Sequence, residues 1–269
     1  MSKKAYSMTL LGCGKMGSAM LRSWIDQGLL TKVIIIDPSE IPKEFTNDPR
    51  IKHIRTADNH SIDTDVFTIA VKPQTLEKSI KNINEIQKAT VLLSILAGKS
   101  IKSLECIFGS NASIIRAMPN TPASIGKGAN VVIANSNVSE HQKDCVSELL
   151  NCLGMTEWIE EESLMNAVTA LSGSGPAYIF YIIEMLAHSG EKLGLKPKLA
   201  MSLARQTVIG SAFLAESDKD TPACKLRENV TSPKGTTEAA LRILMDGRAQ
   251  GIFNEALLAA RKRGEELNS

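Results

Sequence analysis

The chain has 269 residues, of which 43% are hydrophobic, 22% are charged and only 4% are aromatic, with a formal net charge of +2. This balance argues against a nucleic-acid-binding protein, which needs a strongly basic surface, and against a disordered chain. The five cysteines show no paired spacing, so we expect no disulfide framework and no metal site. No apolar run reaches the roughly 18 residues that cross a bilayer, which predicts a cytoplasmic protein without membrane contact.

Short β-like runs alternate with amphipathic stretches in the first half of the chain. Apolar and β-branched runs predict strands at 7–11, 33–36, 66–71, 91–95, 114–116 and 131–134. Between the first two strands, apolar residues recur near the helical period and predict a helix over 16–27. Strands separated by helices are typical of βαβ units, so we expect an α/β fold with a mostly parallel sheet.

The pattern changes after about residue 160, where strand-like runs vanish. Helical periodicity predicts helices at 164–170, 177–193, 198–216, 222–230, 237–245 and 252–267. We therefore expect two domains, residues 1–162 with the sheet and residues 163–269 with helices alone.

A glycine-rich loop stands between the first predicted strand and the first predicted helix. Residues 12–17 read Gly-Cys-Gly-Lys-Met-Gly and fit the G-x-G-x-x-G pattern of dinucleotide-binding loops. The first glycine permits a tight turn, the second lets the backbone approach a pyrophosphate, and the third lets helix and strand pack closely. The free N–H groups at the start of the helix then face the phosphates. The alternative is a glycine-rich turn that binds no ligand.

Asp37 closes the second predicted strand, where an acidic side chain usually accepts hydrogen bonds from the adenosine ribose. A carboxylate there favours NADH, because it repels a 2′-phosphate. Ser39 is able to donate to a phosphate, which favours NADPH, and Asp37 can also serve merely to cap the turn before Pro38. These residues leave the choice of cofactor open.

Three further loops follow predicted strands, at residues 70–73, 94–98 and 118–122. Ligands of open α/β sheets bind at the carboxyl ends of the strands, so these loops are candidate walls for the nicotinamide and its ribose. Lys72 fits a cofactor contact and an ordinary solvated lysine equally well. Loops with proline and glycine are common, so a purely structural interpretation also stands.

Hydroxyl residues gather at 231–237, which read Thr-Ser-Pro-Lys-Gly-Thr-Thr, just before a predicted helix. A helix start offers unpaired N–H groups that suit a carboxylate, although the hydroxyls can instead cap the helix. Four hydroxyls exceed what a cap requires, so a small carboxylate substrate is the sharper explanation. The glycine-rich stretch 171–178 fits tight helix packing as well as a site.

Taken together, these residues resemble the pyrroline-5-carboxylate reductase family along essentially the whole chain. Besides the loop at 12–17, the resemblance rests on Ala70-Val71-Lys72-Pro73, Arg116-Ala117-Met118-Pro119-Asn120-Thr121-Pro122, Leu171-Ser172-Gly173-Ser174-Gly175-Pro176-Ala177 and Val230-Thr231-Ser232-Pro233-Lys234-Gly235-Thr236-Thr237. It implies reduction of 1-pyrroline-5-carboxylate to proline, a Rossmann-like doubly wound N-terminal domain and an all-helical C-terminal dimerisation domain. It also implies an interleaved dimer that often assembles further, commonly into decamers.

By the same resemblance, the substrate carboxylate is held by Ser232, Gly235, Thr236 and Thr237, and the Thr237 hydroxyl reaches the ring nitrogen. The cofactor is NADP(H), with NAD(H) as the alternative. The candidate cofactor contacts are Gly12, Cys13, Gly14, Lys15, Met16, Gly17, Asp37, Ser39, Asn59, Ala70, Val71, Lys72, Pro73, Ala97, Gly98, Met118, Pro119 and Asn120.

The chain departs from the family pattern at two places. Lys234 stands where the family typically has a glycine, and a positive φ there strains a lysine by about 1–2 kcal/mol. Asp37 and Pro38 stand where many NADPH-preferring members have an arginine, which makes that preference less secure.

Two other functions compete with this interpretation. A β-hydroxyacid dehydrogenase-like enzyme, or another imine reductase, shares the two-domain plan, but the former uses a lysine as acid and base on the helix after the glycine-rich stretch. Residues 176–191 contain no lysine. A nucleotide sensor or scaffold without turnover needs no second carboxylate site, so the stretch 231–237 argues against it.

Overall fold

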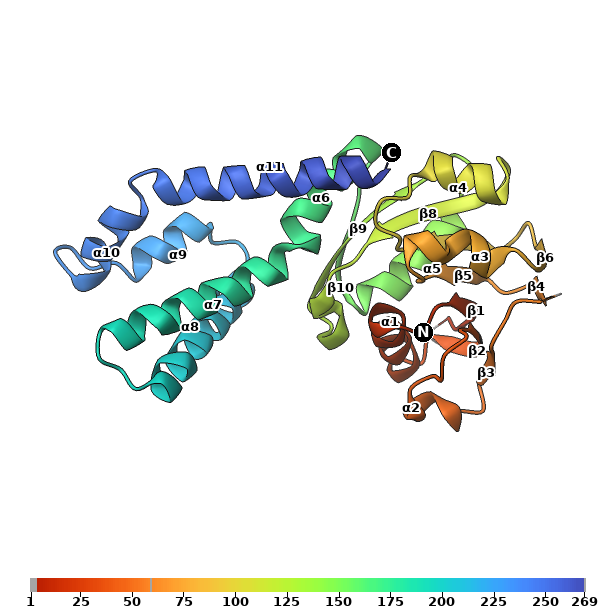
Figure 1. Cartoon of the computed structure of the whole chain (residues 1–269), viewed down its shortest axis with the longest axis horizontal. Helices are drawn as coiled ribbons and strands as arrows, with labels where there is room; N and C mark the ends of the chain where they lie inside the picture. The colour runs from red at the N-terminus through yellow and green to blue at the C-terminus, as the bar shows by residue number, and fades with distance from the viewer. Residues whose placement is uncertain (1–3, 59, 269) are drawn as a thin grey trace. The chain divides into compact units, whose positions relative to one another are not determined.

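The computed structural model describes residues 4–58 and 60–268 of the chain, which form two compact units (Figure 1). The first unit runs to Ser174 and also contains the end of the chain from Ala260 onward, and the second unit is Gly175–Ala259. In the described part of the chain, no helix has the length and apolar character needed to cross a membrane.

The first unit is built on an eight-stranded sheet with the order β10-β9-β8-β7-β5-β1-β2-β3. Its strands are β1 (Tyr6–Leu11), β2 (Leu30–Ile36), β3 (Ile51–Ile54), β5 (Val66–Ile69), β7 (Val91–Ser94), β8 (Ser113–Met118), β9 (Gly128–Ala134) and β10 (Gly154–Trp158). Neighbouring strands are parallel except β8 and β9. The expected mostly parallel, doubly wound sheet is therefore confirmed.

Helices cover both faces of this sheet, as the alternation of side chains along the strands requires. On one face, Met8 and Leu10 of β1 pack in a cluster with residues of α1 (Lys15–Asp26) and α5 (Glu140–Asn151). On the other face, Leu11 belongs to a second cluster with Leu76 of α3 (Leu76–Ile80) and Leu104 of α4 (Ile101–Phe108). The core thus consists of two apolar layers, one on each side of the sheet.

The predicted strands all occur, and short elements add to them. The structure adds β3 and β10 at the two edges of the sheet and a separate two-stranded sheet of β4 (His60–Ile62) and β6 (Ile83–Ile86). The first unit also holds α2 (Lys43–Thr46), α6 (Met165–Val168), 3₁₀ turns at Pro73–Thr75, Thr121–Ile125 and Glu162–Leu164, and a π-helical turn at Thr169–Gly173.

The second unit is helical, as predicted. Its helices are α7 (Gly175–Lys192), α8 (Pro197–Ser217), α9 (Ala223–Asn229), α10 (Thr236–Leu244) and most of α11 (Arg248–Asn268). Small residues let α7 and α8 approach closely, because a side chain at Gly190 would lie 3.3 Å from the Cβ of Ala200.

The compact units divide later than the predicted boundary between residues 162 and 163. Glu162 is anchored in the first unit, because its Oε1 accepts hydrogen bonds from Arg116 Nη1 and from the backbone N–H of Ile101, both at 2.8 Å. Met165 and Ala170 are then buried in the same unit. The polar stretch at 160–163, which motivated the predicted boundary, is therefore an anchored part of the first unit.

Candidate functional site

The carboxyl ends of five strands lie in one row along an edge of the sheet, in register with a residue near the end of a sixth strand, β8. In register from β3 across to β8, the row is Ile54, Ile36, Leu11, Ile69, Ser94 and Arg116. The order of strands reverses between β1 and β5, because the chain first builds outward to β3 and then crosses back to β5. Ligands of open α/β sheets bind at such a switch point.

The glycine-rich loop follows β1 at this switch point, and its three glycines differ in the space that surrounds them. Gly12 has φ +95°, and a Cβ there would lie 2.9 Å from the carbonyl group of Ala70. A Cβ on Gly17 would lie 2.3 Å from the Gly12 carbonyl oxygen, so helix and strand pack too closely for a side chain. Within the described residues, nothing lies within 4 Å of a Cβ placed on Gly14. The space that a pyrophosphate needs is therefore open at the second glycine, as the dinucleotide motif requires.

The start of α1 is prepared for an anion. Gly14 is the N-cap residue, and no side chain of the described residues caps this end of the helix. The first turn carries no acidic residue, so the positive end of the helix dipole faces the open space without competition. Burial, reinforced by the nearby Asp37 carboxylate, raises the pKa of the Cys13 thiol to about 12. The thiol therefore stays neutral and does not repel a phosphate.

Asp37 follows β2 beside this loop, and both of its carboxylate oxygens are engaged. Oδ2 accepts a hydrogen bond from the Cys13 backbone N–H at 2.7 Å, and Oδ1 accepts one from the Ser39 N–H at 2.8 Å. Asp37 thus fastens the end of β2 to the glycine-rich loop, in addition to any contact with a ribose. Ser39 itself is exposed.

The other predicted cofactor contacts of the first unit follow β5, β7 and β8 at the same edge. The Ala70 N–H donates to the Leu11 carbonyl at 2.8 Å, which holds residues 70–73 against the glycine-rich loop, and Lys72 is exposed. Ala97 is exposed after β7, and Gly98 lies against the backbone of Leu267 from the end of α11. Asn59 lies outside the described residues.

The side chains at the end of β8 and just after it make contacts within the first unit. The Asn120 amide donates to the Ser172 carbonyl at 3.0 Å and accepts from the Ala129 N–H at 2.9 Å. Pro119 is buried, and the end of the Met118 side chain occupies the space left open by Gly173. These residues join the loop after β8 to the π-helical turn, so Asn120 has little of its side chain left for a cofactor.

The hydroxyl-rich stretch at 231–237 lies in the second unit and leads into α10. Gly235 is the N-cap residue of this helix, and no described side chain makes the usual cap hydrogen bond. Thr231 is already satisfied, because its hydroxyl donates to the Arg227 carbonyl at 2.7 Å. No hydrogen bond joins the hydroxyls of Ser232, Thr236 or Thr237 to another described residue. Three hydroxyls without a partner among the described residues thus lie in or just before the first turn of an uncapped helix, which can bind a small carboxylate.

Lys234 has φ +61° and is the one non-glycine residue with positive φ among the residues that the structure describes. The strain expected for a lysine at this position is thereby confirmed. Its backbone N–H donates to the carboxylate of Glu238, one turn into α10, so the strained residue is held in place. A Cβ on the next residue, Gly235, would lie 3.0 Å from the Ser232 carbonyl oxygen, which accounts for glycine there.

Two residues of these regions escaped prediction. Arg55 follows β3 in the row of strand ends, and its Nη1 donates to the Pro38 carbonyl at 2.9 Å. Glu238 supports the loop at Lys234. The sequence carries only a weak signal for the first, the short alternation Ile-Lys-His-Ile after the Asp48-Pro49 turn, and none for the second beyond its place three residues after the N-cap.

Two family models match the chain. One, described as pyrroline-5-carboxylate reductase dimerisation, matches residues 162–267. The other, described as NADP oxidoreductase, coenzyme F420-dependent, matches residues 7–98, which contain the glycine-rich loop and the strands from β1 to β7. The first match contains the hydroxyl-rich stretch at 231–237, and the second contains the glycine-rich loop and the loops after β2, β5 and β7.

Relatives match nearly the whole chain. The chain is similar to a pyrroline-5-carboxylate reductase of Pseudomonas aeruginosa, with 35% identity over 97% of this chain and 96% of that protein. The structure of a pyrroline-5-carboxylate reductase from Coxiella burnetii is similar with a TM-score of 0.90 and 32% identity, covering 99% of this chain and all of that one. A pyrroline carboxylate reductase of Plasmodium falciparum, solved with NADP bound, has a TM-score of 0.83 and 29% identity over 100% of both chains.

Proposed function

Because this chain belongs to the pyrroline-5-carboxylate reductase family, we propose that it reduces 1-pyrroline-5-carboxylate to proline with NADP(H), the last step of proline synthesis. The observation that carries the proposal is the start of α10, where free hydroxyls surround an uncapped helix end. A dinucleotide loop alone is compatible with many oxidoreductases. A second site built for a small carboxylate selects among them.

The first unit supplies the cofactor site. The backbone N–H groups at the start of α1 bind the pyrophosphate, and Gly14 leaves room for it. The loops after β5, β7 and β8 form the wall for the remainder of the dinucleotide, with Lys72 and Ala97 exposed at the edge. The NADP-bound relative, similar over 100% of both chains, supports this assignment.

The second unit supplies the groups for the substrate. The N–H groups at the start of α10, with the hydroxyls of Ser232 and Thr236, hold the substrate carboxylate. The Thr237 hydroxyl oxygen accepts a hydrogen bond from the protonated ring nitrogen. A dinucleotide held at the glycine-rich loop would supply the hydride that the imine carbon accepts. Because a protonated imine is already electrophilic, Thr237 and its neighbours contribute mainly orientation, and no acid–base dyad is needed.

Self-association accompanies this function. The family model over 162–267 describes a dimerisation region, and the helices of the second unit carry large apolar side chains on their surface, such as Phe180, Phe213 and Leu214. A second copy of the chain buries such side chains. We propose an interleaved dimer that assembles further, to decamers, in the cytoplasm.

The proposal is tested by replacing Thr237 with alanine. The loss of the hydrogen bond that the charged ring nitrogen donates to Thr237 lowers kcat about tenfold or more, while the KM for NADPH changes less than about twofold. The assay follows NADPH oxidation with pyrroline-5-carboxylate as substrate, with NADH measured in parallel.

Thr231→Ala is the matched control, because the Thr231 hydroxyl is already used within the chain. We expect this variant to keep near wild-type kcat. If Thr237→Ala turned over as fast as the wild type, or if both variants lost activity equally, the assignment of the substrate loop would be wrong.

A further inference from the structure

The adenosine end of the cofactor site includes a residue from a strand that follows the dinucleotide motif. Ile54 ends β3 and pairs with Ile36, the last residue of β2. The Asp37 N–H donates to the Ile54 carbonyl at 3.1 Å, so the residues after these two strands are neighbours. Arg55 therefore emerges at the strand edge beside Asp37, on the side away from β1.

The Asp37 carboxylate is turned toward the glycine-rich loop. Its two oxygens accept the N–H groups of Cys13 and Ser39, so part of its charge is neutralised by backbone dipoles. Asp37 is partly buried, and both of its carboxylate oxygens face backbone N–H groups, so this carboxylate is not directed at the exposed turn of Pro38 and Ser39. The turn can then receive an anion, provided that a cation stands nearby.

Arg55 is that cation. Its Nη1 donates to the Pro38 carbonyl at 2.9 Å, and its Nη2 donates to the carboxylate of Glu40. The side chains of Arg55 and Glu40 are 60% and 79% exposed, so their ion pair is weak and a stronger anion can displace Glu40. The Pro38 carbonyl holds the guanidinium over the turn while its remaining N–H groups stay available.

We propose that Arg55 binds the 2′-phosphate of NADP(H) and is the residue that makes this site prefer NADP(H) over NAD(H). The planar guanidinium donates two parallel hydrogen bonds to the phosphate, and the exposed Ser39 hydroxyl donates another. Glu40 is the competing carboxylate that Arg55 releases when the phosphate binds. The inference rests on the proposed use of NADP(H) at the glycine-rich loop.

The test measures binding by calorimetry on the full-length protein, with NADP⁺, NAD⁺ and the fragment adenosine 2′,5′-bisphosphate. Arg55→Gln lowers the affinity for NADP⁺ and for the bisphosphate about tenfold or more, because hydrogen bonds from a charged donor are lost. NAD⁺ affinity changes less than about twofold. Arg55→Lys keeps the charge but lacks the planar guanidinium with its two parallel donors. Its affinity for NADP⁺ therefore lies between those of the wild type and Arg55→Gln. Glu40→Gln raises the affinity for NADP⁺ and leaves the affinity for NAD⁺ unchanged.

Arg50→Gln is the matched control, because Arg50 precedes β3 and so stands at the opposite edge of the sheet with its own partner, Asp48. We expect its affinity for all three ligands to equal that of the wild type. The proposal is overturned if Arg55→Gln leaves NADP⁺ affinity unchanged, or if NADP⁺ and NAD⁺ weaken by the same factor, as adenine stacking would produce. The bisphosphate contains neither nicotinamide nor imine, so this result is independent of whether the chain reduces pyrroline-5-carboxylate.

Discussion

At the scale of single residues, the loop before α10 combines a strained residue with the side chain that holds it. A left-handed lysine costs about 1–2 kcal/mol relative to glycine. The Glu238 carboxylate accepts the Lys234 N–H and lies at the positive end of α10, where a negative charge is stabilised. The strain is thereby offset within the same loop that presents Thr236 and Thr237. We infer that Lys234 and Glu238 act together to fix this loop.

Substitution at Lys234 separates strain from charge. Lys234→Gly and Lys234→Ala remove the same charge, but only glycine relieves the positive φ, so the glycine variant is more stable by about 1 kcal/mol. The comparison of the two midpoints of urea denaturation measures this difference. Equal midpoints would mean that the backbone at this position is not strained.

Prediction at this scale succeeded where the signal was local. The glycine pattern at 12–17 has the geometry that its spacing indicates, and the strain at Lys234 was expected from one departure in a motif. Arg55 was missed, because its position beside Asp37 depends on the pairing of β2 with β3, which joins residues far apart in the sequence. The engagement of the Asn120 amide likewise depends on partners at Ser172 and Ala129.

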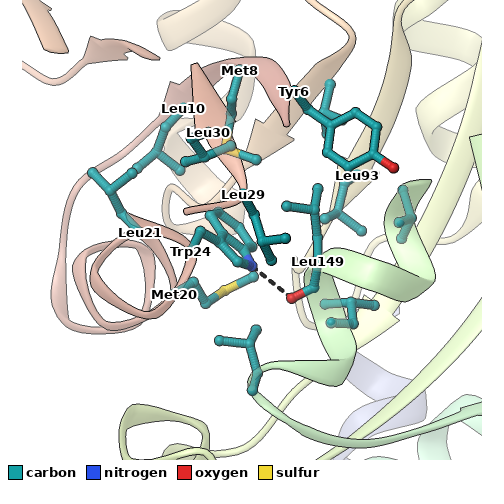
Figure 2. Packing of buried hydrophobic residues seen from close by; sticks show 14 of the residues in the cluster. Tyr6, Met8, Leu10, Met20, Leu21, Trp24, Leu29, Leu30, Leu93 and Leu149 are labelled. Carbon is teal, nitrogen blue, oxygen red and sulfur yellow. Dashed lines mark hydrogen bonds between the residues drawn. The ribbon is translucent and has the colours of Figure 1, made fainter. Parts of the chain in front are cut away.

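At the scale of elements, a buried tryptophan links the two helices α1 and α5, which pack in one apolar cluster on the same face of the sheet. Trp24 of α1 is fully buried, and its indole N–H donates to the Leu149 carbonyl of α5 at 2.7 Å (Figure 2). The same ring packs in a cluster with Met8, Met20 and Leu93. Because α1 begins at the glycine-rich loop, this contact also fixes the helix that carries the proposed phosphate site.

Truncation of this side chain is costly. Trp24→Ala lowers the free energy of unfolding by about 3–5 kcal/mol, since it leaves a large cavity and removes the indole hydrogen bond to the Leu149 carbonyl. Trp158→Ala is the control, because Trp158 lies on the edge strand β10 and is partly exposed. Its cost stays below about 1 kcal/mol. Urea denaturation followed by circular dichroism gives both values, and equal losses would contradict the assigned role of Trp24.

Element prediction followed the strength of the pattern. The buried strands in the middle of the sheet are continuous apolar runs, and such runs predict strands directly from the sequence. The strands β3, β4, β6 and β10 escaped, because they are short and partly exposed and mix polar with apolar residues. Only their pairing partners make them strands.

At the scale of the whole molecule, we expect the exposed apolar side chains of the second unit to mediate the proposed self-association. We expect Phe213→Glu to convert the dimer into monomers, because the side chain is 58% exposed in the single chain and a buried unpaired charge is unfavourable. Met155→Glu is the control, since Met155 is 57% exposed but belongs to β10 of the first unit. Light scattering reads the molar mass, and an unchanged mass for Phe213→Glu would place the interface elsewhere.

The division into two units was only partly predictable. The change from strands to helices near residue 160 is visible in the sequence. Two other features depend on tertiary contacts, which a local sequence pattern does not predict. Arg116 anchors Glu162, and the last residues from Ala260 onward belong to the first unit.

The proposed roles of both loops require that this chain transfers a hydride from NADPH to the imine carbon of pyrroline-5-carboxylate. The most direct measurement uses NADPH deuterated at the transferring position of the nicotinamide and mass spectrometry of the product. We predict proline with one deuterium at C5 for each NADPH oxidised. Unlabelled proline, or oxidation of NADPH without proline, would contradict the account.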